Sequence, residues 1–594
     1  TTGTSNAAFG AAALIGNTTG SNNTAVGRKS LQNNTEGDDN TAVGYEAMAA
    51  NTTGGYNTSI GDTSLDANTT GNNNTALGHN ALGANTTASD NTAVGRSALG
   101  GNTTGASNVA VGRKALQQNN ANNNAAVGYY ALEANTSGYS NTAVGYKALT
   151  DNTTTHSCTA IGNQSAENAT ASYLTAIGDR SMAGATVTGE HNTALGHYTL
   201  YNLTSGARNT GGGSNALASI STGDDNTSLG YNALGATSTG DNNTAVGAYA
   251  GDANTTGTNN TSIGYQALTA ATTATENTAL GSRALAANTG GANTAVGHRA
   301  LEANTSGTQN TALGQRAGYQ LSTGQYNSLH GWNAGGSLTD GNNNTAVGNR
   351  ALDATNSSDN TAIGYSSLSS NCGNQNTAVG SGALLSCTTS NNCALGYNAL
   401  TNCSSGDNNV AMGSGAGDAI TTGTDNTAIG HSALSALTTN HNNVAVGRSA
   451  LAVCTASNNV AVGKNCGAAI VGGDKNSGLG HYAMQACTTG VKNTAIGYQA
   501  GYNITTGDQN VCIGHNTGFS ITTGENNTHI GDYARGSATT DYQIVIGSQA
   551  DAGDTNYKVM LYNGQVNANF TGSASSWTFT SDGRDKTDIV DLDL

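Results

Sequence analysis

The chain has 594 residues and a net charge of −16 at pH 7, and it contains 83 Gly, no Pro and only 9% charged residues. The acidic balance argues against nucleic acid and anionic membrane surfaces as partners, because both attract basic patches. No apolar run approaches the length of a membrane span, and the regularly spaced aliphatic residues argue against a disordered chain.

A segment of about 17 residues recurs along residues 1–549. Each copy has an apolar run such as Asn-Thr-Ala-Val-Gly, two variable residues, a pair such as Ala-Leu, and a polar turn. The glycine that closes the apolar run, here called the anchor glycine, occurs 33 times from Gly10 to Gly547, at 23 spacings of 17 residues, eight of 16 and one of 18. So short a unit cannot bury a core alone, and the copies are therefore expected to stack in one continuous array.

The apolar run alternates with a period of two, which predicts a short β-strand with two faces. Thr24 and Val26 share one face, and Ala25 takes the other. We expect the larger Thr and Val side chains to fill the core of the coil. The alanines are then expected to face outward, where small side chains permit close approach by another chain. After the anchor glycine the chain bends, and the Ala-Leu pair is expected to begin a second short strand.

The turns are rich in Asn, Thr and Gly, and Asn and Gly tolerate the positive φ of tight corners. Stacking places equivalent Asn residues about 4.8 Å apart, so their amides are expected to bond along the stack. The predicted fold is all-β: a parallel β-roll or β-solenoid of about 33 coils of 16–17 residues. Because so small a coil encloses little apolar volume, we expect an elongated homotrimer with the alanine faces of the chains packed together.

A few copies depart from the unit. Gly212 replaces the valine that is expected to point inward, and His330 takes the same position in another copy. Near the C-terminus Cys512, His529 and Val545 replace the alanine. We expect these coils to be weak points, with a wider gap between chains where the alanine is lost.

The residue after each anchor glycine carries the most regular surface pattern. Stacked at one phase, the long side chains at this position form a stripe along one edge of the array. The simpler interpretation is that they cover the corner of a neighbouring chain and staple the trimer. The second is contact with a host glycan, because aromatic faces bind sugar rings and Arg or His bonds hydroxyl or acidic groups. The candidate glycan-contact residues are Tyr45, His79, Arg96, Tyr129, Tyr146, Tyr231, Tyr265, Trp332, Tyr365, Tyr397 and Tyr498.

Cysteines and histidines lack the spacings of metal sites. Eight of the nine cysteines lie between Cys372 and Cys512, without a C-x-x-C pair. Cys387 and Cys403 are 16 residues apart at a turn position where most coils carry Asn; we interpret them as small turn fillers, and a disulfide between them in an oxidising setting stays open. No metal-binding histidine pattern, catalytic triad, P-loop or dinucleotide fingerprint occurs. We therefore expect no metal, no cofactor and no catalysis on a foreign substrate.

The runs Asn459-Val460-Ala461-Val462-Gly463 and Asn409-Val410-Ala411-Met412-Gly413 resemble the Asn-x-Val-Ala-Ile-Gly motif of the head domains of trimeric autotransporter adhesins. This resemblance implies a left-handed parallel β-roll and favours three chains. Similar repeats recur in predicted fibres of phages.

Residues 550–580 break the repeat and are expected to form capping strands. Beyond them Ser581, Asp582, Arg584 and Lys586 match a Ser-Asp-x-Arg-x-Lys pattern. Residues 581–594 thus resemble the opening of the intramolecular chaperone domain of many phage tail spikes and fibres. The resemblance implies self-cleavage after trimerisation, with Ser581, Asp582 and Lys586 as candidate residues, since a hydroxyl beside a proton-accepting lysine suits an acyl shift. The other interpretation is a solvated polar tail.

The leading hypothesis is a structural fibre protein of a phage virion, extracellular and part of a tail fibre or appendage. Its rigid trimeric shaft (1–549) would serve host attachment, with other virion proteins and a host surface glycan as candidate partners. The alternative is a bacterial trimeric surface adhesin or an extracellular filament subunit. An anchor barrel would favour the adhesin, and a chaperone domain the phage fibre.

Overall fold

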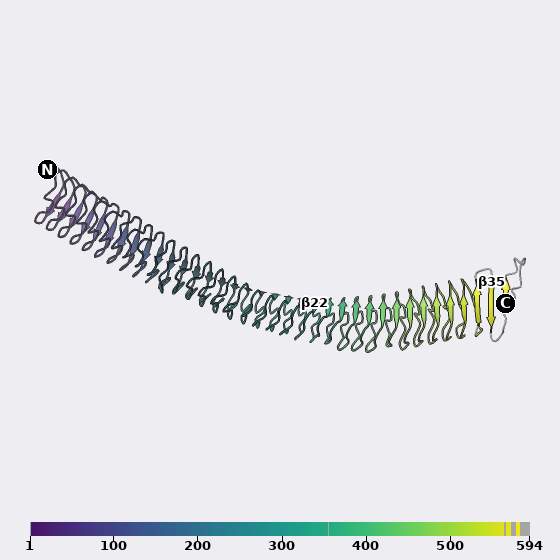
Figure 1. Cartoon of the computed structure of the whole chain (residues 1–594). Coiled ribbons are helices and arrows are strands. Elements are labelled where there is room, and N and C mark those ends of the chain that lie inside the picture. Colours follow the sequence, from purple (N-terminus) through teal and green to yellow (C-terminus); the bar gives the residue numbers. More distant parts are fainter. Residues whose placement is uncertain (1, 355, 557, 563–565, 572–577, 582–594) are drawn as a thin grey trace. The chain divides into compact units, whose positions relative to one another are not determined.

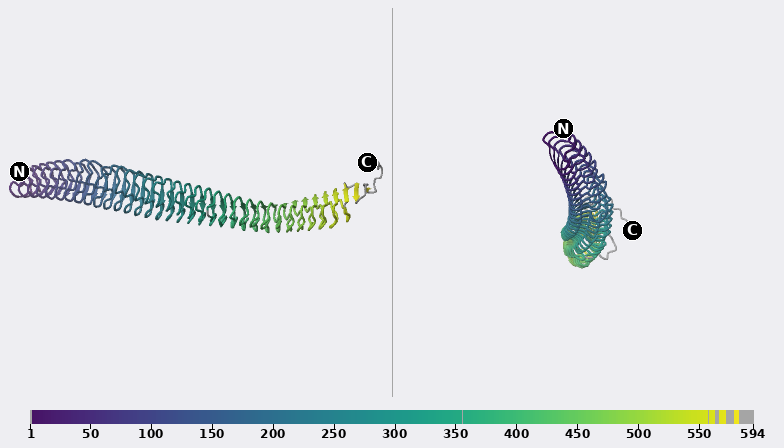
Figure 2. Two further views of the ribbon diagram at one scale, coloured as in Figure 1. Left: turned by 60° about the horizontal axis from the view of Figure 1, so that its bottom comes forward. Right: turned by 90° about the vertical axis from the view of Figure 1, so that its left-hand side faces the viewer.

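The computed structural model describes residues 2–354, 356–556, 558–562, 566–571 and 578–581, the last two ranges as backbone only. The described residues form strands, turns and bends without a helix. The chain divides into two units, 1–306 and 307–594. Within each unit, short strands lie side by side, one for each repeat (Figure 1), and the further views show one loop of chain following the next (Figure 2).

The strands of the first unit are β1 (Ala7–Phe9), β2 (Thr24–Val26), β3 (Thr41–Val43), β4 (Thr58–Ile60), β5 (Thr75–Leu77), β6 (Thr92–Val94), β7 (Val109–Val111), β8 (Ala125–Val127), β9 (Thr142–Val144), β10 (Thr159–Ile161), β11 (Thr175–Ile177), β12 (Thr193–Leu195), β13 (Thr210–Gly212), β14 (Thr227–Leu229), β15 (Thr244–Val246), β16 (Thr261–Ile263), β17 (Thr278–Leu280) and β18 (Thr294–Val296).

The strands of the second unit are β19 (Thr311–Leu313), β20 (Ser328–His330), β21 (Thr345–Val347), β22 (Thr361–Ile363), β23 (Thr377–Val379), β24 (Cys393–Leu395), β25 (Val410–Met412), β26 (Thr427–Ile429), β27 (Val444–Val446), β28 (Val460–Val462), β29 (Ser477–Leu479), β30 (Thr494–Ile496), β31 (Val511–Ile513), β32 (Thr528–Ile530), β33 (Ile544–Ile546), β34 (Lys558–Tyr562), β35 (Val566–Thr571) and β36 (Thr578–Ser581).

Within each unit the repeat strands pair in parallel and in register with the equivalent strands of neighbouring coils. In β2 and β3, for example, Thr24 lies opposite Thr41, Ala25 opposite Ala42, and Val26 opposite Val43. Parallel pairing of successive strands requires the chain to complete one full turn per repeat. The prediction of an all-β parallel β-solenoid of about 33 turns is confirmed.

The orientation predicted for the strand faces is wrong. Ala25 and Ala42 are fully buried inside their own coil, whereas Val26 is 37% exposed. The alanine points inward because the residue four after the anchor glycine, usually Leu or Met as in Met48, already fills most of the narrow interior. A close-packed core leaves the strand room for little more than a methyl group.

Complementary volumes inside one coil show why the alanine is small. In β20 the inward residue is Leu329, and the residue four after that anchor is Gly335 instead of leucine. A Cβ on Gly335 would lie 2.8 Å from Leu329 Cδ2. Gly518 faces Cys512 in the same way, with a Cβ placed 2.3 Å from the Cys512 Sγ. In these two coils the two inward positions share one volume. In other coils with glycine four after the anchor the inward residue stays alanine, and a turn side chain fills the space, as Ile420 does beside Gly417.

The inward orientation of the alanine also corrects the predictions made for the irregular copies. His330 and Gly212 lie at the outward position of their strands, not inside the coil. Cys512, His529 and Val545 are fully buried within the chain, so the loss of alanine there changes the core of the coil and not a gap between chains.

The expected second strand after the anchor glycine does not form. Instead, Glu46 and Met48 both adopt φ of 53°, and the equivalent positions of most coils are likewise left-handed. Their amides still bond between coils, from Glu46 N to Arg28 O (3.0 Å) and from Met48 N to Ser64 O (3.0 Å). Left-handed φ is costly for such side chains, so these coil-to-coil bonds and the buried Met48 side chain must hold it.

Two ladders of buried asparagines run along the stack, as predicted. In the first, the backbone N–H of Asn57 donates to the side-chain Oδ1 of Asn40 (3.0 Å), and the backbone N–H of Asn74 donates to the side-chain Oδ1 of Asn57 (2.9 Å). In the second, Asn51 Nδ2 donates to Asn34 Oδ1 (2.6 Å). The ladders satisfy buried backbone groups at the corners, where strand pairing has ended.

The last strands depart from the repeat. β34 pairs in parallel with β33, and then β34, β35 and β36 pair antiparallel to one another. Ser581 is the last residue of β36, whereas Asp582 and Lys586 lie outside the described residues.

Candidate functional site

The stripe after the anchor glycines is exposed, as Tyr45, Trp332 and Tyr365 show with 41–58% exposure. Several aromatic members contact one another across consecutive coils. The rings of Tyr129 and Tyr146 stack with centroids 5.8 Å apart, and Tyr498 stacks on His515 at 5.4 Å.

Other members of the stripe pair with cations or with rings of the adjacent position. The Arg350 guanidinium lies 5.7 Å from the Trp332 ring. Tyr231 and Tyr265, two coils apart, both contact Tyr249, at 5.3 and 6.5 Å. The stripe is therefore a series of short aromatic stacks between coils of one chain, and its contact with glycan stays a prediction.

The stripe's remaining members lie apart from these stacks. His79 lies 4.0 Å from Asp62. The Arg28 guanidinium lies over the Tyr45 ring, 5.6 Å from the ring centroid. Tyr365 and Tyr397 lie between coils that carry Asn or Ser at this position, whereas Arg96 lies between His79 and Arg113.

The outward face of the repeat strands is an exposed surface of uniform composition. It carries a row of Thr and a row of Val, Ile or Leu, with Val26 37%, Leu77 44% and Leu229 58% exposed. None of the outward positions of β2–β33 holds Asp, Glu, Lys or Arg, and His330 is the one histidine among them. We call this surface the Thr/aliphatic face. Contiguous exposed apolar rows of this kind mark interaction surfaces.

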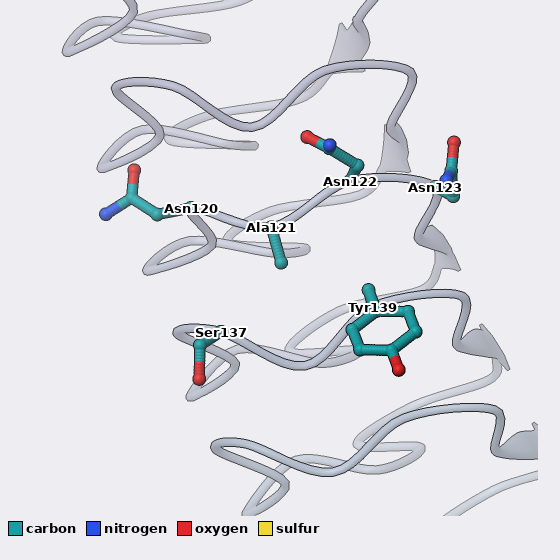
Figure 3. Close-up of a pocket in the computed structure, with 6 residues that line it drawn as sticks. All are labelled: Asn120, Ala121, Asn122, Asn123, Ser137 and Tyr139. Atoms are coloured by element: carbon teal, nitrogen blue, oxygen red, sulfur yellow. The ribbon is translucent and has the colours of Figure 1, made fainter.

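A second feature lies at the polar turns of the first unit, where a notch of about 320 Å³ opens between two coils. Figure 3 shows its lining side chains on two successive turns. They are Asn120, Ala121, Asn122, Asn123, Ser137 and Tyr139.

From the notch a ladder of rings continues along the turns. Tyr139 stacks on His156 (4.7 Å between centroids, 27° between planes), His156 meets Tyr173 edge-on (5.0 Å, 80°), and Tyr173 stacks on His191 (4.8 Å, 7°). Sequence reasoning missed this ladder because it followed only the position after the anchor glycine.

Eight of the nine cysteines, all but Cys393, are buried inside the coils, and so is His529. Burial raises the pKa of Cys512 to about 12 and lowers the pKa of His529 to about 4. Cys387 differs, because a hydrogen bond from the Cys403 thiol on the next coil lowers the pKa of Cys387 below its usual range. Across the described ranges no three His, Cys, Asp or Glu side chains gather as a metal-binding group.

Comparison with known proteins gives no relative: no family model, no curated protein and no solved structure matches the chain. Within the described part of the chain, no helix combines the length and apolar character needed to cross a bilayer.

Proposed function

We propose that the chain is a structural fibre protein of a phage virion, a homotrimeric shaft for host attachment. The observation that carries the proposal is the Thr/aliphatic face, which repeats once per coil without a charged side chain. A second copy of the same chain is the partner whose rows have the same spacing, because its strands are stacked by the same backbone pairing.

The energy available at this face is large. Burying a fully exposed Val, Leu or Ile contributes about 1.5–3 kcal/mol. The aliphatic side chains are about two-fifths exposed, so covering one contributes about 0.6–1.2 kcal/mol. Summed over the array, the gain is on the order of tens of kcal/mol, which exceeds the usual cost of association.

The interface proposed here replaces the alanine faces expected from the sequence. Three copies are favoured by the resemblance to trimeric adhesin heads, and a virion origin by the Ser-Asp-x-Arg-x-Lys pattern. The acidic chain, with a net charge of −16, keeps the remaining surface soluble.

Light scattering of the purified chain tests the assembly, with an expected mass of three times 58.9 kDa. A short tris-maleimide cross-linker tests the interface. Ile177→Cys, on the Thr/aliphatic face, is expected to give covalent trimers. Thr154→Cys, at an exposed turn, is the matched control and should stay uncross-linked. Both variants are made with Cys393→Ser, because Cys393 is a partly exposed native thiol on the Thr/aliphatic face. A monomer in solution, or equal cross-linking of the two variants, would contradict the proposed assembly.

Antibody labelling locates the protein. Gold particles on the appendages of purified virions are the expected result. Labelling of bacterial cell surfaces without virions would instead support the adhesin.

A further inference from the structure

The Thr/aliphatic face has two different long edges, because its strands have a direction. Within each unit the repeat strands point the same way (Figure 1). The chain therefore enters the face along one edge and leaves it along the other. We call the second and third residues before each repeat strand the entry edge, and the two residues after each anchor glycine the exit edge. The exit edge includes the stripe described above.

The two edges carry opposite charge. In the first unit the exit edge holds nine Lys or Arg and three Asp or Glu, whereas the entry edge holds eight Asp or Glu and one Arg. In the second unit the exit edge holds four Lys or Arg and one Asp, and the entry edge holds seven Asp or Glu and two Lys. Asp90 and Arg96, on either side of β6, are both exposed, and the extended chain between them keeps them about 20 Å apart. The charges of the two edges therefore cannot pair across the face of one chain.

The cations directly after the anchor glycines lack partners of opposite charge within the chain. Arg96 and Arg113 occur in consecutive coils, and so do Arg448 and Lys464. Adjacent coils are about 4.8 Å apart, so these like charges repel one another. Within the described residues no carboxylate forms an ion pair with any of the four, whereas the lysines one position further along pair with glutamates at 2.8–3.0 Å.

The acids of the entry edge carry more charge than the local fold requires. Asp38 Oδ1 accepts from the Ser21 amide of the preceding coil (2.7 Å). Asn122 Oδ1 accepts the equivalent bond from the Ala106 amide (2.8 Å), so the position needs an acceptor oxygen but no charge. Another molecule is therefore needed to match the negative charge of this edge.

We propose that copies of this chain associate in parallel, with the exit edge of each copy along the entry edge of the next. Rotation about an axis along the stack brings the Thr/aliphatic faces together and places opposite charges side by side. An antiparallel arrangement would instead set exit edge against exit edge and entry edge against entry edge, so like charges would meet. An anionic polymer would match the exit edge but leave the entry edge unmatched, whereas a second copy matches both. This pairing rests on the proposed burial of the Thr/aliphatic face, but not on the number of copies or on a virion.

The rate of assembly tests the edge pairing, because charges at the rim of an interface act mainly on the association rate. Arg448→Glu with Lys464→Glu reverses the exit edge in two consecutive coils. Lys475→Glu with Lys492→Glu is the matched control, since it reverses two charges in the same unit but on the entry edge. Light scattering follows chains that are dissociated in mild denaturant and returned to buffer. The exit-edge variant should assemble about tenfold more slowly than the control at low salt, and at the same rate as the control at high salt.

Energy transfer between fluorescent labels tests the polarity. Thr19→Cys, at an exposed turn of the first coil, is labelled with a donor in one batch and an acceptor in another. Both batches carry Cys393→Ser, because Cys393 is partly exposed. Parallel copies bring donor and acceptor to the same level of the stack, so transfer is expected in the mixed assembly.

Absence of transfer, or equal assembly rates of the two charge variants at low salt, would overturn the pairing. A wild-type chain that stays monomeric refutes the proposed assembly and this pairing together, whereas a trimer that gives either of those two results refutes the pairing alone.

Discussion

Substitution of one buried ladder asparagine by alanine is expected to open the solenoid locally. Asn57 is fully buried, and its Oδ1 is the acceptor for the Asn74 amide N–H at 2.9 Å. In Asn57→Ala that N–H is left buried without an acceptor, which costs about 1–3 kcal/mol. Asn57 Nδ2 also donates to Gly71 O (2.9 Å), but Gly71 O keeps a second donor in Asn68 Nδ2 (3.0 Å). Loss of this bond therefore adds only about 1 kcal/mol.

Together these terms predict a local destabilisation of about 2–4 kcal/mol, or about 30- to 900-fold faster amide exchange at Asn74 and its neighbours. Hydrogen exchange read by mass spectrometry measures this directly, coil by coil. Thr53→Ala, at an exposed position of the same turn, is the control and should change exchange little. If the Asn74 amide exchanged at the wild-type rate in Asn57→Ala, the ladder would not be holding the corner and the reasoning would fail.

Three further experiments have expected outcomes. Gly463→Ala should destabilise its coil by at least about 2 kcal/mol, since φ is 136° and the new Cβ would lie 2.3 Å from the next coil's carbonyl oxygen; Gly472→Ala in the same coil, with no atom nearer than 3.9 Å, should be nearly neutral by hydrogen exchange. Because burial lowers the pKa of His529 to about 4 from 6.5 unfolded, the unfolded chain binds more protons between these values. The coil should therefore lose about 3 kcal/mol as pH falls from 6.5 to 4, and His529→Val should flatten that pH dependence in exchange measurements. Oxidised glutathione should leave Cys387 and Cys403 unlinked in the folded chain, because both side chains are fully buried and closed to the oxidant; peptide mapping that finds a disulfide between them would contradict this.

Sequence periodicity was sufficient to predict the fold but not to predict which strand face points into the coil. The spacing of anchor glycines and the Asn-rich turns predict stacked coils and ladders, because both follow from repetition alone. Period-two alternation, however, defines two faces without saying which is inside. The pairing of Leu329 with Gly335 is one sign of the true orientation in the sequence, but coils such as Ala411 with Gly417 lose the leucine four positions after the anchor and keep the strand alanine.

Of the two features at the polar turns, the ring ladder could have been predicted from the sequence and the notch could not. Counting eleven residues after Gly128, Gly145 and Gly162 finds Tyr139, His156 and Tyr173 in the sequence, so the ring ladder was within reach of the method that found the exposed stripe. The notch was not. The turn 120–123, between Asn119 and Asn124, is one residue shorter than its neighbours. A short turn predicts either a gap or a tighter fit, and the sequence does not decide between them.

The inward alanines change what assembly must achieve. Had they faced outward, each coil would lack part of its core, and separation of the chains would unfold them. With Ala42 and Met48 packed together inside one chain and the asparagine ladders closed within it, each solenoid has a complete interior. Separation then exposes aliphatic rows but breaks no buried polar network, so a dissociated chain should remain folded and associate non-specifically through its Thr/aliphatic face. In the proposed trimer, folding and association would therefore be separate steps, because association covers the Thr/aliphatic face without completing the interior of any chain.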